Sequence, residues 1–282
     1  MRKYVLSLLL ALTISITGLC QKTPVYEIYI LKYASLAKKT TLADWVQGGP
    51  KDSTDSYFMF WLIKDGHGKN ILVDAGTSCN TPDAIDFGLI NCKRQDSLLM
   101  ELGIKASDIT DIIVTHPHWD HINGINLFPA AQIWMQKEDY NYYTGGAWQK
   151  DGHHGGFAKN EILYLVQKNL DGKVTLVDGD NKEIFPGIKV YTGSRHTYNS
   201  QYVGVQSGSD RIIIASDNIW FYYSLEHMLP APSFGTFDAT GYVAAMKRMK
   251  TLASKTTFIL PGHDPKAFLQ FPKMTENIVR VK

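Results

Sequence analysis

The chain has 282 residues, of which 44% are hydrophobic and 20% are charged, and its formal net charge is +2. This length and apolar content suffice for one large α/β core, and no linker, low-complexity tract or long charge run marks a second domain. The near balance of basic and acidic side chains argues against a nucleic-acid partner.

The N-terminal segment has the pattern of a secretory signal peptide. Arg2 and Lys3 precede an apolar stretch, Tyr4 to Cys20, which is short for a membrane span. We therefore expect a signal peptide over residues 1–20 and one mature domain over residues 21–282, exported to the periplasm or secreted. Loss of Arg2 and Lys3 makes the number of basic side chains equal to the 27 acidic ones.

The cysteines leave two alternatives open. Cys20 is a candidate for lipidation instead of cleavage, although Leu19 before it is bulkier than lipoprotein processing normally accepts. Cys79 and Cys92 remain in the mature domain. They are candidates for a disulfide in an oxidising compartment, but two thiols separated by a loop are as often free, and their spacing does not decide.

Short apolar runs bounded by turn residues predict strands. In chain order these runs are Val25–Ile30, Tyr57–Ile63, Asn70–Val73, Asp111–Thr115 and Ala131–Met135, and then a second set, Lys173–Val177, Ile188–Thr192, Gln201–Gln206, Arg211–Ala215 and Thr257–Leu260. Helical patterns cover Ser97–Leu102, Lys137–Tyr143, Glu161–Lys168 and Tyr242–Ala253. The turn signal at Asp65–Gly68 predicts a hairpin, so some strands should pair antiparallel. The whole pattern predicts an α/β fold with mixed sheets.

A dense group of polar side chains follows the apolar run 111–115. His116, His118, Asp120 and His121 lie within the six-residue motif His-Pro-His-Trp-Asp-His. Imidazole and carboxylate groups at this density, fixed where a strand ends, are typical of a site for a divalent metal. An isolated His is usually a surface or core residue, but four ligand-type residues in six positions are hard to explain in that way.

Three further residues follow the ends of other predicted strands. His196, Asp217 and His263 each come directly after an apolar run or after a short turn that ends one. Loops at strand ends project side chains into a site while the sheet holds their backbone in place. These residues are therefore candidates to complete the metal site.

In this order, the motif, the single His, the Asp and the final His resemble the dinuclear hydrolases of the metallo-β-lactamase superfamily. The resemblance covers nearly the whole mature chain, from the turn Asp74–Gly76 to His263. It implies a four-layer αββα sandwich of two mixed β-sheets, with two metals in the cleft between them. It also implies that Asp74 orients a ligating imidazole, and the alternative is that this Asp only forms the turn that leads to Gly76.

The resemblance also implies how the ligands are shared. His116, His118 and His196 would hold one metal, Asp120, His121 and His263 would hold the other, and Asp217 would bridge the two. Two divalent ions roughly 3.5 to 4 Å apart lower the pKa of a water molecule toward neutrality and polarise a carbonyl or phosphoryl group. Hydrolysis is therefore the expected reaction. We expect zinc, although such a mixed nitrogen and oxygen site also accepts Mn, Fe or Co.

The segments 195–202 and 215–223 resemble N-acyl homoserine lactonases, particularly secreted ones of the Bacteroidetes type. The resemblance implies opening of a small-molecule lactone, with Asp120 assisting the departing ring oxygen, and the quenching of quorum signals. An organophosphate triesterase, or another exported esterase of this fold, is the alternative. A metal-binding protein without turnover is the non-enzyme alternative.

Lactonases of this family use a tyrosine three residues after the bridging Asp, whose hydroxyl donates a hydrogen bond to the oxyanion. This chain has Trp220 at that position. Tyr222 and Tyr223 follow closely, and Tyr223 is our candidate for the catalytic role. The alternative is that both tyrosines pack the wall of the cleft.

Aromatic residues near the motif predict the character of the substrate site. Trp119 lies between two candidate ligands and is expected to face the reacting centre. The Gly-rich segment Gly145–Gly156, with Tyr143 and Phe157 beside it, is placed to act as a mobile lid over an acyl tail. A solvated surface loop is the alternative for this segment.

Overall fold

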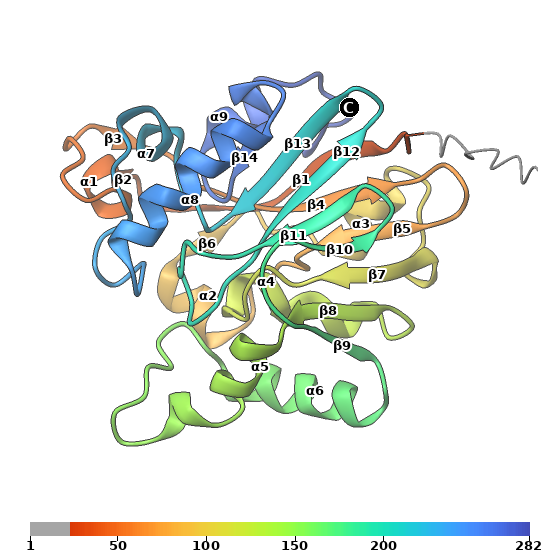
Figure 1. Cartoon of the computed structure of the whole chain (residues 1–282), viewed down its shortest axis with the longest axis horizontal. Coiled ribbons are helices and arrows are strands. Elements are labelled where there is room, and N and C mark those ends of the chain that lie inside the picture. The colour runs from red at the N-terminus through yellow and green to blue at the C-terminus, as the bar shows by residue number, and fades with distance from the viewer. Residues whose placement is uncertain (1–22) are drawn as a thin grey trace, which may run out of the picture.

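The computed structural model describes residues 23–282, so the signal peptide expected over residues 1–20 lies outside the described part of the chain. Two mixed β-sheets pack face to face, and helices cover their outer faces (Figure 1). This arrangement confirms the expected four-layer αββα architecture. Among residues 23–282, no helix has the length and apolar character needed to cross a membrane.

The larger sheet is built mainly from the first half of the chain. Its order is β15 (Ile278–Arg280), β1 (Glu27–Leu36), β4 (Tyr57–Lys64), β5 (Asn70–Val73), β7 (Ile109–Ile113), β8 (Gln132–Gln136) and β9 (Val174–Val177), and β6 (Leu89–Ile90) also pairs with β1. The pairs from β15 to β5 are antiparallel, and those from β5 to β9 are parallel. The predicted hairpin at Asp65–Gly68 joins β4 to β5.

The smaller sheet has the order β10 (Lys182–Phe185), β11 (Ile188–Tyr191), β12 (Tyr202–Ser207), β13 (Asp210–Ser216) and β14 (Ile259–Pro261). Its pairs are antiparallel except for β13 and β14, which run parallel. Two further short strands, β2 (Thr40–Thr41) and β3 (Ser53–Thr54), pair with each other.

Nine α-helices occur in the described residues: α1 (Leu42–Trp45), α2 (Pro82–Phe87), α3 (Gln95–Met100), α4 (Trp119–Ile122), α5 (Lys137–Tyr143), α6 (Lys159–Leu170), α7 (Tyr222–His227), α8 (Ala239–Leu252) and α9 (Pro265–Leu269). Helix α8 shows why such a segment is helical. The Asp238 side chain caps its N-terminus by accepting from the Gly241 amide. Tyr242, Met246 and Met249 recur at helical spacing and form its buried face.

Two apolar cores hold the layers together. One fills the space between the two sheets and extends under α8, and the other lies between the larger sheet and the helices α3 to α6. Strand β4 belongs to both cores, because its residues from Phe58 to Ile63 are buried on either face. Strands covered on both sides read as continuous apolar runs, as this one does.

The predicted strands all occur, with bounds shifted by a few residues, but their division into two sets was wrong at one point. The run Lys173–Val177 contains β9, which pairs with β8 of the larger sheet instead of joining the smaller one. The C-terminal β15 also returns to the larger sheet, beside β1. Both placements depend on pairing between distant segments, which local apolar patterns do not encode.

Candidate metal centre

All seven predicted metal ligands converge in the structure. They come from the segments that follow β7, β11, β13 and β14. Because β13 and β14 are parallel neighbours, their carboxyl ends meet at one edge of the smaller sheet and bring Asp217 beside His263. The side chains form two groups, each with candidate ligand atoms within 4.8 Å of one another: His116, His118 and His196, and Asp120, His121, Asp217 and His263.

The carboxylate of Asp217 touches both groups. Its Oδ2 lies 3.1 Å from Nε2 of His263 and 3.6 Å from Nε2 of His196. Its Oδ1 lies 3.4 Å from Nε2 of His121. A carboxylate has two oxygens that can serve two partners, so this position suits a bridge between two cations.

Hydrogen bonds fix the direction in which the imidazoles point. Three rings donate their Nδ1 hydrogen to an oxygen: His121 to Asp74 at 2.9 Å, His196 to the Gly235 carbonyl at 2.8 Å, and His263 to the Tyr57 carbonyl at 3.0 Å. A ring held through Nδ1 directs its Nε2 at the metal position, and a metal that binds there displaces any proton that Nε2 carries. In all three rings Nε2 faces the Asp217 carboxylate.

Buried atoms without partners indicate that the centre is built for cations. Among residues 23–282, Nε2 of His116, Nε2 of His121 and Oδ1 of Asp217 are buried and have no hydrogen-bond partner. Buried polar atoms in proteins ordinarily have partners, so such a group needs an explanation. Neutral imidazoles combined with carboxylates are a suitable donor set for zinc and related divalent metals. The residues present therefore fit two such ions.

The electrostatics of the centre also favour positive charge. Burial lowers the pKa of His118 to about 3, so this imidazole is neutral at ordinary pH. Burial acts in the same direction on His121, but the charges of Asp120, Asp217 and Asp74 outweigh it and raise the pKa of His121 well above its usual value. The carboxylates thus create a strongly negative potential at the place where a cation would sit.

Asp74 supports the centre from behind. Its side chain is fully buried, and its oxygens accept hydrogen bonds of 2.8 Å from the Thr115 amide, the Thr115 hydroxyl and the Ser216 hydroxyl. The same carboxylate accepts from Nδ1 of His121. Asp74 therefore contacts an imidazole of the centre, as the sequence predicts.

The backbone around the centre is held in an unusual conformation. Asp74, Arg195 and Ser216 have φ angles of 61°, 50° and 49°, in the left-handed region that costs a residue with a side chain about 1–2 kcal/mol. Two of them directly precede His196 and Asp217. At Gly262, a Cβ atom would lie 2.2 Å from Oδ1 of Asp217, so only glycine allows β14 to end so close to it. Such strain is typical of functional sites.

An aromatic cleft opens over the two groups. Its volume is about 330 Å³ and its walls carry six aromatic side chains: Trp45, Phe58, Phe87, Trp119, Trp220 and Phe234. Trp119 faces the cleft, as expected from its place in the motif. A second hollow of about 500 Å³ shares His118, His196 and Phe234 with the cleft and adds Tyr143 and Phe157. Substrate atoms in the cleft would therefore meet both the centre and an apolar surface.

The structure does not bring the candidate Tyr223 to this cleft. Its ring packs against His227, with ring centroids 4.0 Å apart, and it is not among the residues that line the cleft. The Tyr222 hydroxyl donates to the Ile259 carbonyl at 2.8 Å. The reason is that both residues belong to the short helix α7, which sequence reasoning missed, and which directs their side chains away from the centre. The catalytic role of Tyr223 stays a prediction without support from its position.

Sequence reasoning also missed a contact made by Trp220. Its indole Nε1 donates to Oδ2 of Asp217 at 2.8 Å. The one feature of the sequence that could have indicated this contact is the tryptophan itself, which stands where the family resemblance predicts a tyrosine.

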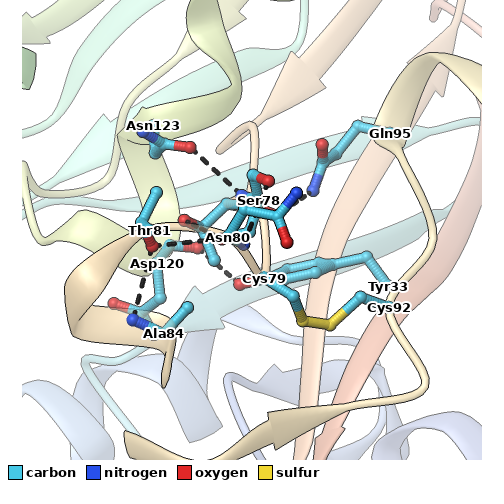
Figure 2. Close-up of a disulfide and its surroundings, with 11 residues drawn as sticks. Tyr33, Ser78, Cys79, Asn80, Thr81, Ala84, Cys92, Gln95, Asp120 and Asn123 are labelled. Atoms are coloured by element: carbon cyan, nitrogen blue, oxygen red, sulfur yellow. Dashed lines mark hydrogen bonds between the residues drawn. A yellow bond between two sulfur atoms is a disulfide. The ribbon is translucent and has the colours of Figure 1, made fainter. Parts of the chain in front are cut away.

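A disulfide joins Cys79 and Cys92, which settles the pairing that their spacing left open (Figure 2). The bridge closes the loop that carries α2, and Phe87 at the end of α2 lines the cleft. Beside it, the Tyr33 hydroxyl donates to the Asp120 carbonyl at 2.7 Å (Figure 2). The disulfide therefore braces one wall of the cleft.

The sequence profile of the metallo-β-lactamase superfamily matches residues 56–263. Together with the two sheets and the seven converging side chains, this match shows that the chain belongs to the metallo-β-lactamase superfamily. Its fold and its His and Asp site are those of a metal-dependent hydrolase.

Within the superfamily the chain is similar to N-acyl homoserine lactonases. It is 24% identical over 169 residues to the N-acyl homoserine lactonase of Bacillus cereus, a match that covers 60% of this chain and 61% of the relative. The chain thus spans about three fifths of the length of that curated relative. A solved quorum-quenching N-acyl homoserine lactone lactonase superposes with a TM-score of 0.70 at 20% identity, covering 90% of this chain and 98% of that one.

A second solved structure is AidC, described as a dizinc quorum-quenching lactonase in complex with a product. It superposes with a TM-score of 0.66 at 18% identity, covering 92% of this chain and 95% of that chain. At these identities the two structural matches establish the fold.

Proposed function

We propose that this protein is a dinuclear-metal hydrolase that opens the lactone ring of N-acyl homoserine lactones. The observation that carries the proposal is the Asp217 carboxylate, which lies between two groups of buried imidazoles at the base of an aromatic cleft. The similarity to N-acyl homoserine lactonases suggests the substrate class, N-acyl homoserine lactones.

The seven side chains would hold two divalent ions, with zinc as the expected metal. His116, His118 and His196 would bind one ion, Asp120, His121 and His263 the other, and Asp217 would span both. When bound, the metals supply an acidified water and an electrophile that polarises the lactone carbonyl. The hydrogen bonds from His121, His196 and His263 to their acceptors keep the rings oriented during turnover.

Two features of the chain would act on the substrate directly. Asp120 lines the cleft, and its carboxylate would take up the proton that the attacking water loses and deliver it to the departing ring oxygen. The aromatic walls would bind the acyl part of the substrate and exclude water from the centre. The adjoining hollow, with Tyr143 and Phe157, extends this apolar surface for a longer acyl chain.

We also propose that the protein works outside the cytoplasm. The disulfide between Cys79 and Cys92 supports this location, because structural disulfides persist in oxidising compartments and are rare in the cytosol. Degradation of extracellular quorum signals would follow from the location and the substrate together. Sequencing the N-terminus of the native protein tests the export step, since an intact Met1 would contradict it.

The compact aromatic cleft is also suited to an organophosphate triesterase, which is the alternative function. An assay that monitors pH distinguishes the two activities. Opening a lactone releases acid, so purified protein should acidify solutions of short-chain and long-chain homoserine lactones. A phosphotriester is measured beside them. Acid release with the phosphotriester alone would support the alternative, and no reaction with any of the three would contradict both.

A further inference from the structure

We propose that Trp220 is a positioning residue of the metal centre, whose indole N–H holds the Asp217 carboxylate in the orientation that reaches both groups of ligands. This inference rests on the metal-binding part of the proposed function. It assigns a role to the tryptophan that stands where the family resemblance predicts a tyrosine.

The contact between the two residues is short and dry. Nε1 of Trp220 donates to Oδ2 of Asp217 at 2.8 Å, and both side chains are buried. A hydrogen bond to an ionised carboxylate away from water is stronger than one between neutral groups. The bond restrains rotation of the carboxylate, and with Oδ2 held in this way Oδ1 stays directed at Nε2 of His121, 3.4 Å away.

Packing in turn fixes the indole ring. Trp45 contacts it edge-on, with ring centroids 5.4 Å apart, and Phe234 packs at 6.0 Å. At Gly235, a Cβ atom would lie 2.2 Å from the indole Cη2, so this segment passes directly against the ring. The Gly235 carbonyl is the acceptor for Nδ1 of His196. Trp220 therefore supports Asp217 through its N–H and His196 through the backbone that lies on its ring.

The hydrogen bond also determines what Trp220 offers to a substrate. Indole has a single donor and no acceptor, and that donor is already bonded to Asp217. In this arrangement the residue presents an apolar ring to the cleft and donates nothing to a substrate oxygen. Its contribution to turnover would therefore pass through the geometry of the metal centre.

The test compares Trp220→Phe with Trp134→Phe in otherwise full-length protein. The Trp134 Nε1 also donates to a carboxylate, Oδ1 of Asp111 at 2.8 Å, but neither of these residues lines the cleft. The two variants thus remove the same kind of indole hydrogen bond, and only one removes it from Asp217. Each protein is loaded with Co²⁺, and its visible absorption spectrum and its rate of metal loss to a chelator are measured.

We expect Trp220→Phe to lose Co²⁺ about tenfold faster or more, the usual effect of removing a partner of a metal ligand, and to shift the spectrum. Trp134→Phe should match the wild type in both measurements. The inference is overturned if Trp220→Phe behaves like the wild type, or if Trp134→Phe changes as much. It is also overturned if metal-free Trp220→Phe unfolds at a much lower denaturant concentration than metal-free Trp134→Phe, because general packing would then explain the loss. Wild-type protein that takes up no Co²⁺ would instead contradict the proposed function, and this inference with it.

Discussion

Replacing Asp74 with Asn perturbs the metal centre without removing any of its seven side chains. Four hydrogen bonds of 2.8–2.9 Å end on the Asp74 carboxylate, from the Thr115 amide and hydroxyl, the Ser216 hydroxyl and Nδ1 of His121. The residue thus ties the ends of β5, β7 and β13 to one imidazole. We expect Asp74→Asn to weaken both the fold and the retention of metal.

The distribution of these hydrogen bonds between the two oxygens of Asp74 determines how much stability the substitution costs. Oδ2 accepts three of them and Oδ1 accepts only the one from the Thr115 amide. The Asn amide group should therefore replace Oδ1, which leaves the Thr115 N–H facing another donor. A buried donor without an acceptor costs about 1–3 kcal/mol of unfolding free energy. Loss of the negative charge behind His121 should in addition lower metal affinity about 10- to 100-fold.

Urea unfolding of the metal-free protein and competition with a metal chelator measure the two effects separately. Asp111→Asn is the matched control, because Asp111 is a buried carboxylate on β7 that accepts from Lys69 and from the Trp134 indole, each at 2.8 Å, away from the centre. It should lose stability and keep its metal affinity. The reasoning is refuted if Asp74→Asn retains wild-type metal affinity, or if Asp111→Asn loses as much.

Three further outcomes are expected. Burial raises the pKa of Asp139 to about 7, so this residue keeps its proton in the folded state at pH values where the unfolded chain has lost it. The unfolding free energy should therefore fall by up to about 4 kcal/mol as the pH rises from 4 to 7. Urea titrations across this range should show a weaker pH dependence for Asp139→Asn, and an unchanged one would count against the assignment. Replacing Cys79 and Cys92 with Ser should lower the unfolding free energy by about 3 kcal/mol, because the disulfide closes a short loop. Reduction of the wild-type disulfide should have the same effect. Equal denaturation midpoints with and without the disulfide would disprove this. Since the Tyr223 ring lies on His227 and outside the cleft, Tyr223→Phe should leave kcat for a lactone unchanged, and a tenfold decrease would restore the catalytic role predicted from the sequence.

Much of the fold could be predicted because local pattern and tertiary environment agree. The runs that became β4 and β13 are continuous apolar segments, and both are buried along most of their length. The seven candidate ligands were found because each comes after such a strand, and the rigid ends of β7 in one sheet and of β11, β13 and β14 in the other hold the side chains that converge. The chemistry of the centre was therefore accessible from residue type and position along the chain.

The features of the fold and the site that the sequence did not predict depend on contacts between distant segments. Pairing of Tyr29 with Arg280 joins the two ends of the described chain, and no local pattern announces it. The short helix α7 places Tyr222 and Tyr223 away from the cleft, whereas the sequence alone only put them near Asp217. The hydrogen bond from the Trp220 indole to Asp217 depends on the turn that follows β13. Ser216, the last residue of β13, has a positive φ that leads into this turn, but in the sequence it looks like an ordinary strand position.

Metal analysis of the purified protein, combined with a lactone assay of the same sample, tests the central claim most directly. The account predicts two divalent transition-metal ions per chain, loss of lactone opening when a chelator removes them, and recovery when zinc or cobalt is restored. Full lactone opening by a preparation that contains no divalent metal would contradict it.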